Sequence, residues 1–209
     1  MIFAEEKIDL LRNKVKLFLT EKRYVHTLGV EKMARHIGKV LMPENVVELA
    51  VAALLHDVAK ELPFDEQVEL LLKSDYPYDE EELSLKPALH SISAIPVIKR
   101  DFFEYSTDNV LSAVANHTLG NAKMSVFDEI IFISDYAEEG RTYRACVEVR
   151  NLLLENLKED GSIEDNLLVL HTASLKAIDS TIESLTGRSE KIGTRTFLTK
   201  QYIESIISK

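Results

Sequence analysis

Apolar residues recur at steps of three and four positions along most of this chain, the spacing that places them on one face of an α-helix. No convincing run alternates between apolar and polar residues, as a half-buried strand would. Only 7 Gly and 5 Pro are spread over 209 residues, so few positions interrupt a helix. The pattern therefore predicts an all-α fold.

The expected helices follow one another with recognisable starts and stops. A third helix runs from Pro43, which suits a first helical turn, to about Glu61, where Pro63 ends it. After a short helix, the stretch up to position 87 is expected to be an acidic connection, with Glu80 to Glu82 as a solvated loop. The other expected helices are marked by Ile8, Leu11, Val15 and Phe18; by His26, Val30, Met33 and Ile37; by a short helix from near Pro87; by Val110 to His117, ending at Gly120; by about Ser125 to Glu138; by Ser162 to Leu185; and by a final helix in the tail.

The third expected helix contains two polar residues in an otherwise apolar stretch. In "AALLHDVAKEL", residues 52 to 62, His56 and Asp57 are adjacent within a segment that should be buried. Burying an unpaired carboxylate or imidazolium costs several kcal/mol, so such groups normally need a partner, a proton shift or a metal. Asp135, which follows the apolar string "IIFIS", is a second carboxylate of this kind.

Three further histidines are expected to face the core. His26 and His117 are in phase with the apolar residues of their helices, and His90 lies on the short helix after Pro87. Each alone is more often a hydrogen-bonded core residue than a ligand, but their joint occurrence with the HD pair and Asp135 on five helical segments favours one metal site. Imidazole and carboxylate groups without sulfur suit iron, manganese or a catalytic zinc.

The two remaining histidines are expected to have no part in that site. His36 lies off the face that His26 and Met33 define, and His171 lies beside the apolar stripe of its helix. We interpret both as structural or surface residues.

The net charge and the cysteine content restrict the ligands and the cellular compartment that such a site is expected to have. The net charge of −10 argues against a general affinity for nucleic acid, so a phosphate-bearing ligand would need a local positive site. Cys146 is the only cysteine, which excludes a disulfide framework and fits a reducing, cytoplasmic setting. We expect a soluble protein that does not enter a membrane, because the first residues resemble no signal peptide and no run approaches the ~18 to 20 apolar residues of a membrane span.

Three basic residues are candidates for that positive site. Lys60 stands one helical turn beyond His56, and its alternative interpretation is a surface lysine paired with Glu61 or Glu44. Arg141 lies on a turn that follows Gly140, and Arg23 precedes His26 by three residues. An arginine can contact a phosphate through two N–H groups at once.

The order of H, HD, two further histidines and D resembles the HD-domain metal-dependent phosphohydrolase superfamily. Flanking strings resemble its YqeK-type branch, the symmetrical dinucleoside tetraphosphatases, over roughly residues 20 to 150, whereas the part from about 160 matches weakly and mainly through "TRTFLTKQYI". The matching strings are "RYVHTLGV" (23–30), "LLHDVAK" (54–60), "LHS" (89–91), "NHTLGNAKMS" (116–125) and "FISDYAEEGRTY" (132–143).

The resemblance implies a fold and a set of residue roles. It implies a single all-α HD-type helical bundle over residues 1–209, with the motif-bearing core at about 20–150 and C-terminal helices at about 160–209. The first metal would be bound by His26, His56, Asp57 and Asp135. The resemblance implies iron as this metal, with manganese or another divalent ion as alternatives, and either one or two ions in all. His90 and His117 would either complete a second metal position or contact phosphates, and Lys60, Arg141 and Arg23 would bind substrate. The residues that take part in catalysis would be His56, Asp57, Lys60, His90 and His117.

The same resemblance implies hydrolysis of diadenosine tetraphosphate into two ADP by metal-activated water. The partner is then a small dinucleoside polyphosphate, or ADP, rather than a nucleic acid. Two alternatives stay open at this stage: another HD-type nucleotidase or phosphodiesterase, and a non-catalytic nucleotide sensor. A homodimer is compatible with the sequence, which does not fix the oligomeric state.

Overall fold

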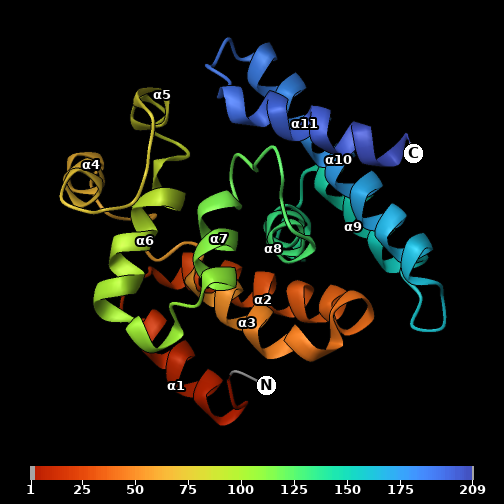
Figure 1. The fold of residues 1–209 in the computed structure, drawn as a ribbon, viewed down its shortest axis with the longest axis horizontal. Helices are drawn as coiled ribbons and strands as arrows, with labels where there is room; N and C mark the ends of the chain where they lie inside the picture. The colour runs from red at the N-terminus through yellow and green to blue at the C-terminus, as the bar shows by residue number, and fades with distance from the viewer. Residues whose placement is uncertain (1–2, 209) are drawn as a thin grey trace.

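The computed structural model describes residues 3–208, which form eleven α-helices and two short 3-10 helices and contain no strand (Figure 1). The expectation of an all-α fold is confirmed. The helices are α1 (Glu6–Val15), α2 (Glu21–Leu41), η1 (Pro43–Asn45), α3 (Val46–Leu55), α4 (Phe64–Leu72), α5 (Glu80–Ser84), α6 (Leu89–Asp101), η2 (Phe103–Tyr105), α7 (Asp108–Asn116), α8 (Val126–Ala137), α9 (Arg144–Asn156), α10 (Ile163–Gly187) and α11 (Thr194–Ile207).

Two helices, α3 and α8, form the centre of the fold. Every residue from Leu49 to Leu55 in α3 is buried, and so is every residue from Phe127 to Ser134 in α8. A helix that is apolar on all sides must be covered on all sides. Accordingly α3 packs against α1, α2, α7 and α8, while α8, seen end-on in Figure 1, also packs against α2, α9 and α10. Polar residues at the C-terminal ends of these two helices therefore lie inside the protein.

Three of the helices that position the candidate residues, α2, α7 and α8, begin with a capped first turn. Thr20, Thr107 and Ser125 precede α2, α7 and α8, and each side-chain oxygen accepts a hydrogen bond from the backbone N–H three residues later. Such caps satisfy N–H groups that the first helical turn leaves without a partner. Ser125 also forms a reciprocal capping box with Asp128. The caps set the residue at which each helix begins, and with it the direction of every later side chain.

The expected helix from Pro43 to Glu61 is wrong at both ends. Pro43 begins the 3-10 helix η1, and the α-helix that follows ends at Leu55, directly before the HD pair. Beyond it the backbone continues in tighter turns, in which Lys60 N–H donates to the Asp57 carbonyl at 2.9 Å. The sequence pattern did not predict this change, because the apolar residues continue through Val58 and Ala59. At the actual end of the helix, the His56 ring lies against the backbone carbonyl of Ala53.

The expected solvated loop at Glu80 to Glu82 is also wrong. These residues form the short helix α5, which begins with a capping box between Asp79 and Glu82. Glu82 is buried and forms an ion pair with Arg195 of α11. The sequence could not reveal this pair, because the two residues are far apart along the chain.

Among residues 3–208, no helix combines the length and the apolar character that crossing a membrane would require.

Candidate metal centre

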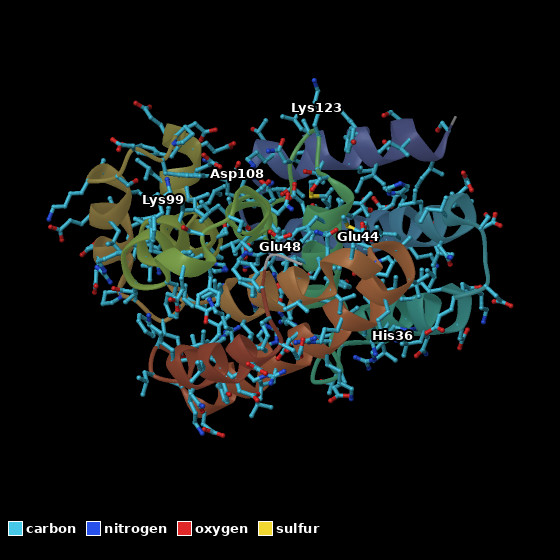
Figure 2. The ribbon with its side chains drawn as sticks, turned by 60° about the horizontal axis from the view of Figure 1, so that its bottom comes forward. His36, Glu44, Glu48, Lys99, Asp108 and Lys123 are labelled. Atoms are coloured by element: carbon cyan, nitrogen blue, oxygen red, sulfur yellow. The ribbon has the colours of Figure 1, made fainter. Side chains whose placement is uncertain are left out.

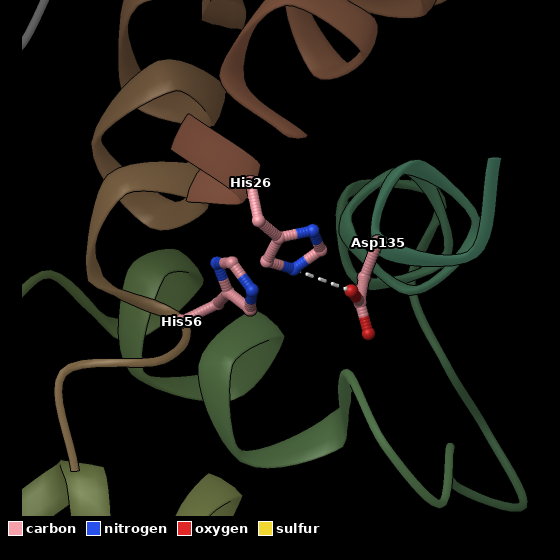
Figure 3. Close-up of side chains that lie close together, drawn as sticks. All are labelled: His26, His56 and Asp135. Carbon is pink, nitrogen blue, oxygen red and sulfur yellow. Dashed lines mark ion pairs between the residues drawn. The ribbon is translucent and has the colours of Figure 1, made fainter. Parts of the chain in front are cut away.

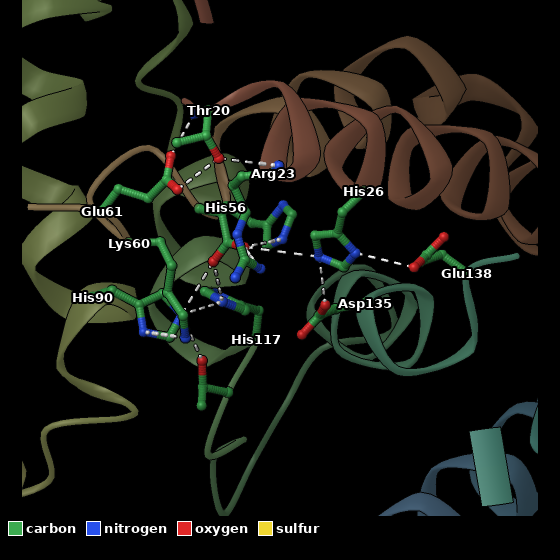
Figure 4. Close-up of polar contacts among 12 residues, drawn as sticks. Thr20, Arg23, His26, His56, Lys60, Glu61, His90, His117, Asp135 and Glu138 are labelled. Atoms are coloured by element: carbon green, nitrogen blue, oxygen red, sulfur yellow. Dashed lines mark hydrogen bonds and ion pairs between the residues drawn. The ribbon is translucent and has the colours of Figure 1, made fainter. Parts of the chain in front are cut away.

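Five segments bring polar side chains together beside the C-terminal end of α3 (Figure 4). They are α2, the turn after α3, the first turn of α6, the end of α7 and the last turns of α8. The sequence-predicted site residues, of which the histidines and aspartates were expected on five helical segments, are thus neighbours in space. They are Arg23, His26, His56, Asp57, Lys60, His90, His117, Asp135 and Arg141.

His56 and His117 are held by the same local arrangement. Each directly follows a helix, and each ring has its Nδ1 close to the backbone carbonyl three residues earlier, at 2.6 Å for Ala53 and 2.7 Å for Val114. Because a carbonyl only accepts, Nδ1 carries the proton, and the lone pair of each ring is on Nε2. The two helix ends therefore fix both the tautomer and the direction of the imidazole, as metal-ligating histidines require.

His26 is oriented by a buried carboxylate, Glu138. The Nδ1 of His26 lies 3.1 Å from Oε1 of Glu138, which directly follows α8. Gly29, one turn after His26 on α2, leaves room for this carboxylate, because a Cβ there would lie 2.4 Å from its Oε2. With Nδ1–H donated to Glu138, Nε2 faces Oδ1 of Asp135, 3.0 Å away, where it can donate a proton to the carboxylate or, once deprotonated, offer its lone pair to a metal ion.

Asp57 stands between two groups of histidines. Its Oδ2 lies 3.3 Å from His56 Nε2 and 3.8 Å from His26 Nε2. Its Oδ1 lies 3.2 Å from His90 Nε2 and 3.7 Å from His117 Nε2. Each oxygen of the Asp57 carboxylate thus faces a different pair of histidines. A carboxylate in this position could contribute one oxygen to each of two cation sites.

The charges of these groups are set by their surroundings. Burial alone would raise the pKa of Asp57, but His56, His117 and His90 outweigh it and hold that pKa well below its usual range. Burial lowers the pKa of His90 to about 4, so its ring is neutral at pH 7. For His26 the effect of burial is outweighed by hydrogen bonds to Asp135 and Glu138, which raise its pKa to about 9. An ionised Asp57 and a neutral His90 are the protonation states that bind metals, whereas His26 would release to a bound metal the proton that Asp135 and Glu138 stabilise.

The donor atoms fit a divalent metal ion. His26, His56 and Asp135 each offer one ligand atom, and these three atoms lie within 4.8 Å of one another (Figure 3). The Nε2 atom of His56 is buried and has no hydrogen-bond partner among the described residues. A buried nitrogen without a partner costs free energy that a bound cation would recover. A second group with the same spacing consists of His56, Asp57 and His117.

Three basic side chains surround this cluster. Arg23 Nη1 donates to Asp57 Oδ2 at 2.8 Å, and Arg141 Nη2 donates to Asp135 Oδ1 at 2.5 Å. Lys60 Nζ lies 3.1 Å from His90 Nδ1, and burial lowers its pKa. The alternative pairing of Lys60 with Glu61 is wrong, because Glu61 instead accepts hydrogen bonds from the backbone N–H and the hydroxyl of Thr20.

The two histidines that were expected to have no part in the site, His36 and His171, lie outside the cluster. His36 is on the exposed side of α2 (Figure 2). His171 is buried, and its Nδ1 lies 2.9 Å from Oε2 of Glu129. Their interpretation as surface and structural residues agrees with these positions.

Two residues of the cluster carry no role in the sequence interpretation. They are Glu138 and Thr118, whose hydroxyl lies 3.3 Å from His90 Nε2. Both lie within the strings that resemble the family, next to Glu139 and His117, and this position was the only indication in the sequence that they belong to the site. Glu138 itself resembles a residue of a solvated turn, because an acid and a glycine follow it.

A cavity of about 560 Å³ opens beside the cluster. Arg23, His26 and Arg141 line it together with residues of the N-terminal half of α2 and of the segment after α8. A ligand in this cavity would contact the two arginines that reach the metal-site carboxylates.

Comparison with known proteins identifies the family. The family model described as HD domain matches residues 23–140, more than half of the chain and every candidate site residue except Arg141. The chain belongs to the HD-domain family.

Several HD-domain relatives are similar over most of their length. A Bacillus subtilis (strain 168) protein named symmetrical bis(5'-nucleosyl)-tetraphosphatase is 27% identical over 192 residues, covering 91% of this chain and 94% of the relative. A Halalkalibacterium halodurans protein of the same name is 31% identical over 166 residues, covering 78% and 84%. The crystal structure of a Clostridium acetobutylicum protein, described as a predicted HD superfamily hydrolase involved in NAD metabolism, is 27% identical, with a TM-score of 0.80 and 98% coverage of both chains.

Proposed function

We propose that this HD-domain protein is a metal-dependent hydrolase that cleaves diadenosine tetraphosphate symmetrically into two ADP. The observation that carries the proposal is the convergence of His26, His56, Asp57 and Asp135 next to Arg23 and Arg141. The Bacillus subtilis and Halalkalibacterium halodurans relatives, whose names state this activity, support the choice of substrate.

We propose iron as the metal, with manganese as a substitute. His26, His56, Asp57 and Asp135 would hold the first ion, and Oδ1 of Asp57 with His90 and His117 would hold a second. Nδ1 of His56 donates to the Ala53 carbonyl, so only its Nε2 can bind a metal. His56 can therefore be a ligand of only one of the two ions. When bound, such an ion supplies hydroxide near neutral pH and shields the negative charge of phosphate oxygens.

The basic residues would bind and orient the phosphates. Arg23 and Arg141 each direct one N–H to a metal-site carboxylate, Arg141 also donates from Nε to the backbone carbonyl of Asp135 at 3.0 Å, and both side chains line the cavity. Both are fork-shaped donors that match phosphate oxygens. Lys60 would contribute a point charge beside His90. These residues would supply locally the positive charge that a protein of net charge −10 lacks as a whole.

The product pattern tests the proposal. With iron or manganese added, chromatography of a diadenosine tetraphosphate digest should show ADP alone. ATP together with AMP would disprove symmetrical cleavage, and turnover only of mononucleotides or cyclic dinucleotides would favour a different HD-domain hydrolase.

Two variants separate hydrolysis from nucleotide sensing. His56→Ala should lose bound metal and at least ~100-fold in kcat, because it removes a ligand of the proposed ion. His36→Ala is the matched control, a histidine on the exposed side of α2, and it should behave as the wild type. A wild type that binds metal but turns over no nucleotide would show that the protein is a sensor.

A further inference from the structure

The cavity beside the metal centre is lined by both polar and apolar side chains. Its polar lining includes Arg23, His26 and Arg141, together with the carboxylates of Glu61, Glu138 and Glu139. Val25 and Tyr143 also line the cavity and are exposed by 59% and 77%. Single exposed apolar residues are common on protein surfaces. What distinguishes these two is that they border the same cavity as the arginines of the metal centre.

On α2, the wall of the cavity is one helical face. Lys22, Val25, His26 and Gly29 follow the i, i+3, i+4, i+7 spacing, and all four line the cavity. The exposed Val25 is therefore on the side of α2 that carries the proposed metal ligand His26. A ligand bound along this face would contact the imidazole and the valine together.

In the segment between α8 and α9, Tyr143 follows Arg141 by two residues, and both line the cavity. Tyr143 precedes α9 with an extended backbone, φ −62° and ψ 139°, and its ring is not packed into the core. Two extended residues span at most ~7 Å. A ribose can bridge that separation between a phosphate at Arg141 and a base at Tyr143.

We propose that Tyr143 and Val25 form a nucleobase subsite, with the ring of Tyr143 stacking on the base of a nucleoside diphosphate whose phosphates lie at Arg23 and Arg141. This inference rests on the proposed function for the identity of the ligand. Stacking on an aromatic ring tolerates any base, because every base has a π-face. The subsite therefore recognises a nucleobase without selecting strongly among bases, and it distinguishes nucleotides from inorganic phosphates.

Binding measurements with two probes, ADP and inorganic pyrophosphate, test the subsite without requiring turnover. Tyr143→Leu should raise the Kd of ADP by roughly 5- to 150-fold, the range that corresponds to the loss of one stacked base. It should leave the Kd of pyrophosphate unchanged, since this probe has no base. Tyr143→Phe keeps the ring and should bind ADP within about 2-fold of the wild type.

The matched control is Phe103→Leu, because Phe103 is an aromatic residue that is also 77% exposed but does not line this cavity. It should change neither Kd. The proposal is overturned if Tyr143→Leu binds ADP as the wild type does, or if it weakens ADP and pyrophosphate equally. Failure of the proposed function has a different signature: no hydrolysis of diadenosine tetraphosphate by the wild type, with the ADP and pyrophosphate results unaffected.

Discussion

At the scale of single residues, the orientation of His26 depends on a contact between distant parts of the chain. Glu138 can reach Nδ1 of His26 only because Gly29 has no side chain. The carboxylate also accepts a hydrogen bond from Gly140 N–H at 2.5 Å. Burial would raise the pKa of Glu138, but its contacts with His26 and Gly140 lower it overall, so it is an anion at neutral pH.

Replacing Glu138 by Gln should therefore weaken metal binding while leaving every proposed ligand in place. The amide keeps the size of the side chain but removes the negative charge that holds the His26 tautomer. Loss of such a partner typically costs 10- to 100-fold in metal affinity, so we expect a loss of about that size. Competition with a fluorescent chelator measures it. Glu139→Gln is the control, since Glu139 is exposed and pairs with Lys32, and equal affinities of the two variants would contradict the role of Glu138.

The same contact shows what could be predicted from the sequence at this scale. His26, His56, Asp57 and Asp135 were predictable because a titratable group in an apolar helix needs a partner. Glu138 was not, because its burial depends on Gly29 of another helix. Whether a residue at the end of a helix is buried is decided by the elements that pack around it.

At the scale of elements, α11 is linked to the segment that carries His117. Arg195 of α11 donates to the side chain of Asn116 at 2.6 Å and to the carbonyl of Gly120 at 3.0 Å, and it forms an ion pair with Glu82. Gly120 has φ +71°, and a Cβ there would lie 2.5 Å from the side chain of Thr199, also on α11. The C-terminal string that matched the family only weakly thus holds both sides of His117 and Thr118.

Arg195→Met should destabilise the protein by ~2 to 4 kcal/mol. The substitution leaves Glu82 and Asn116 largely buried without their partner, which is more costly than the loss of a surface ion pair. Urea denaturation measures the change in the free energy of unfolding. Lys200→Met is the control on the same helix: its pair with Asp179 is solvent-exposed, and its loss should cost less than ~1 kcal/mol. Equal destabilisation by both variants would contradict the linking role of Arg195.

Helix positions were easier to predict than helix ends. Ser125 and Ser162, predicted as first residues, are the N-caps of α8 and α10. The end of α3 at Leu55 could not be predicted, because no proline or glycine marks it and the apolar residues continue beyond it.

At the scale of the whole molecule, one apolar cluster extends from Phe3 to Ile203 and includes residues of α1, α3, α8 and α10. We propose from this continuity that the chain folds as a single domain, as the sequence resemblance implied. The buried members of the candidate site, among them His56 and Asp57, are surrounded by this apolar core, where charged groups are costly unless they are paired. Folding and metal binding should therefore be coupled.

Metal removal should lower the melting temperature in one cooperative step. An ion that binds only the folded state stabilises it by ~4 kcal/mol when its free concentration is 1,000 times its Kd. For a chain of this size that corresponds to a shift of roughly 8 to 16 °C. Calorimetry and circular dichroism, each with manganese and then with excess chelator, measure the shift and should give coincident transitions.

His56→Ala is the control for this shift, because it lacks one proposed ligand and should melt at nearly the same temperature with and without metal. An unchanged melting temperature of the wild type after chelation would contradict the coupling. Two separate transitions would contradict the single domain, and the variant would then show which of them depends on the metal. Since Asp57 is in contact with side chains of α2, α6 and α7, we expect one transition in which the metal centre and the apolar core are lost together.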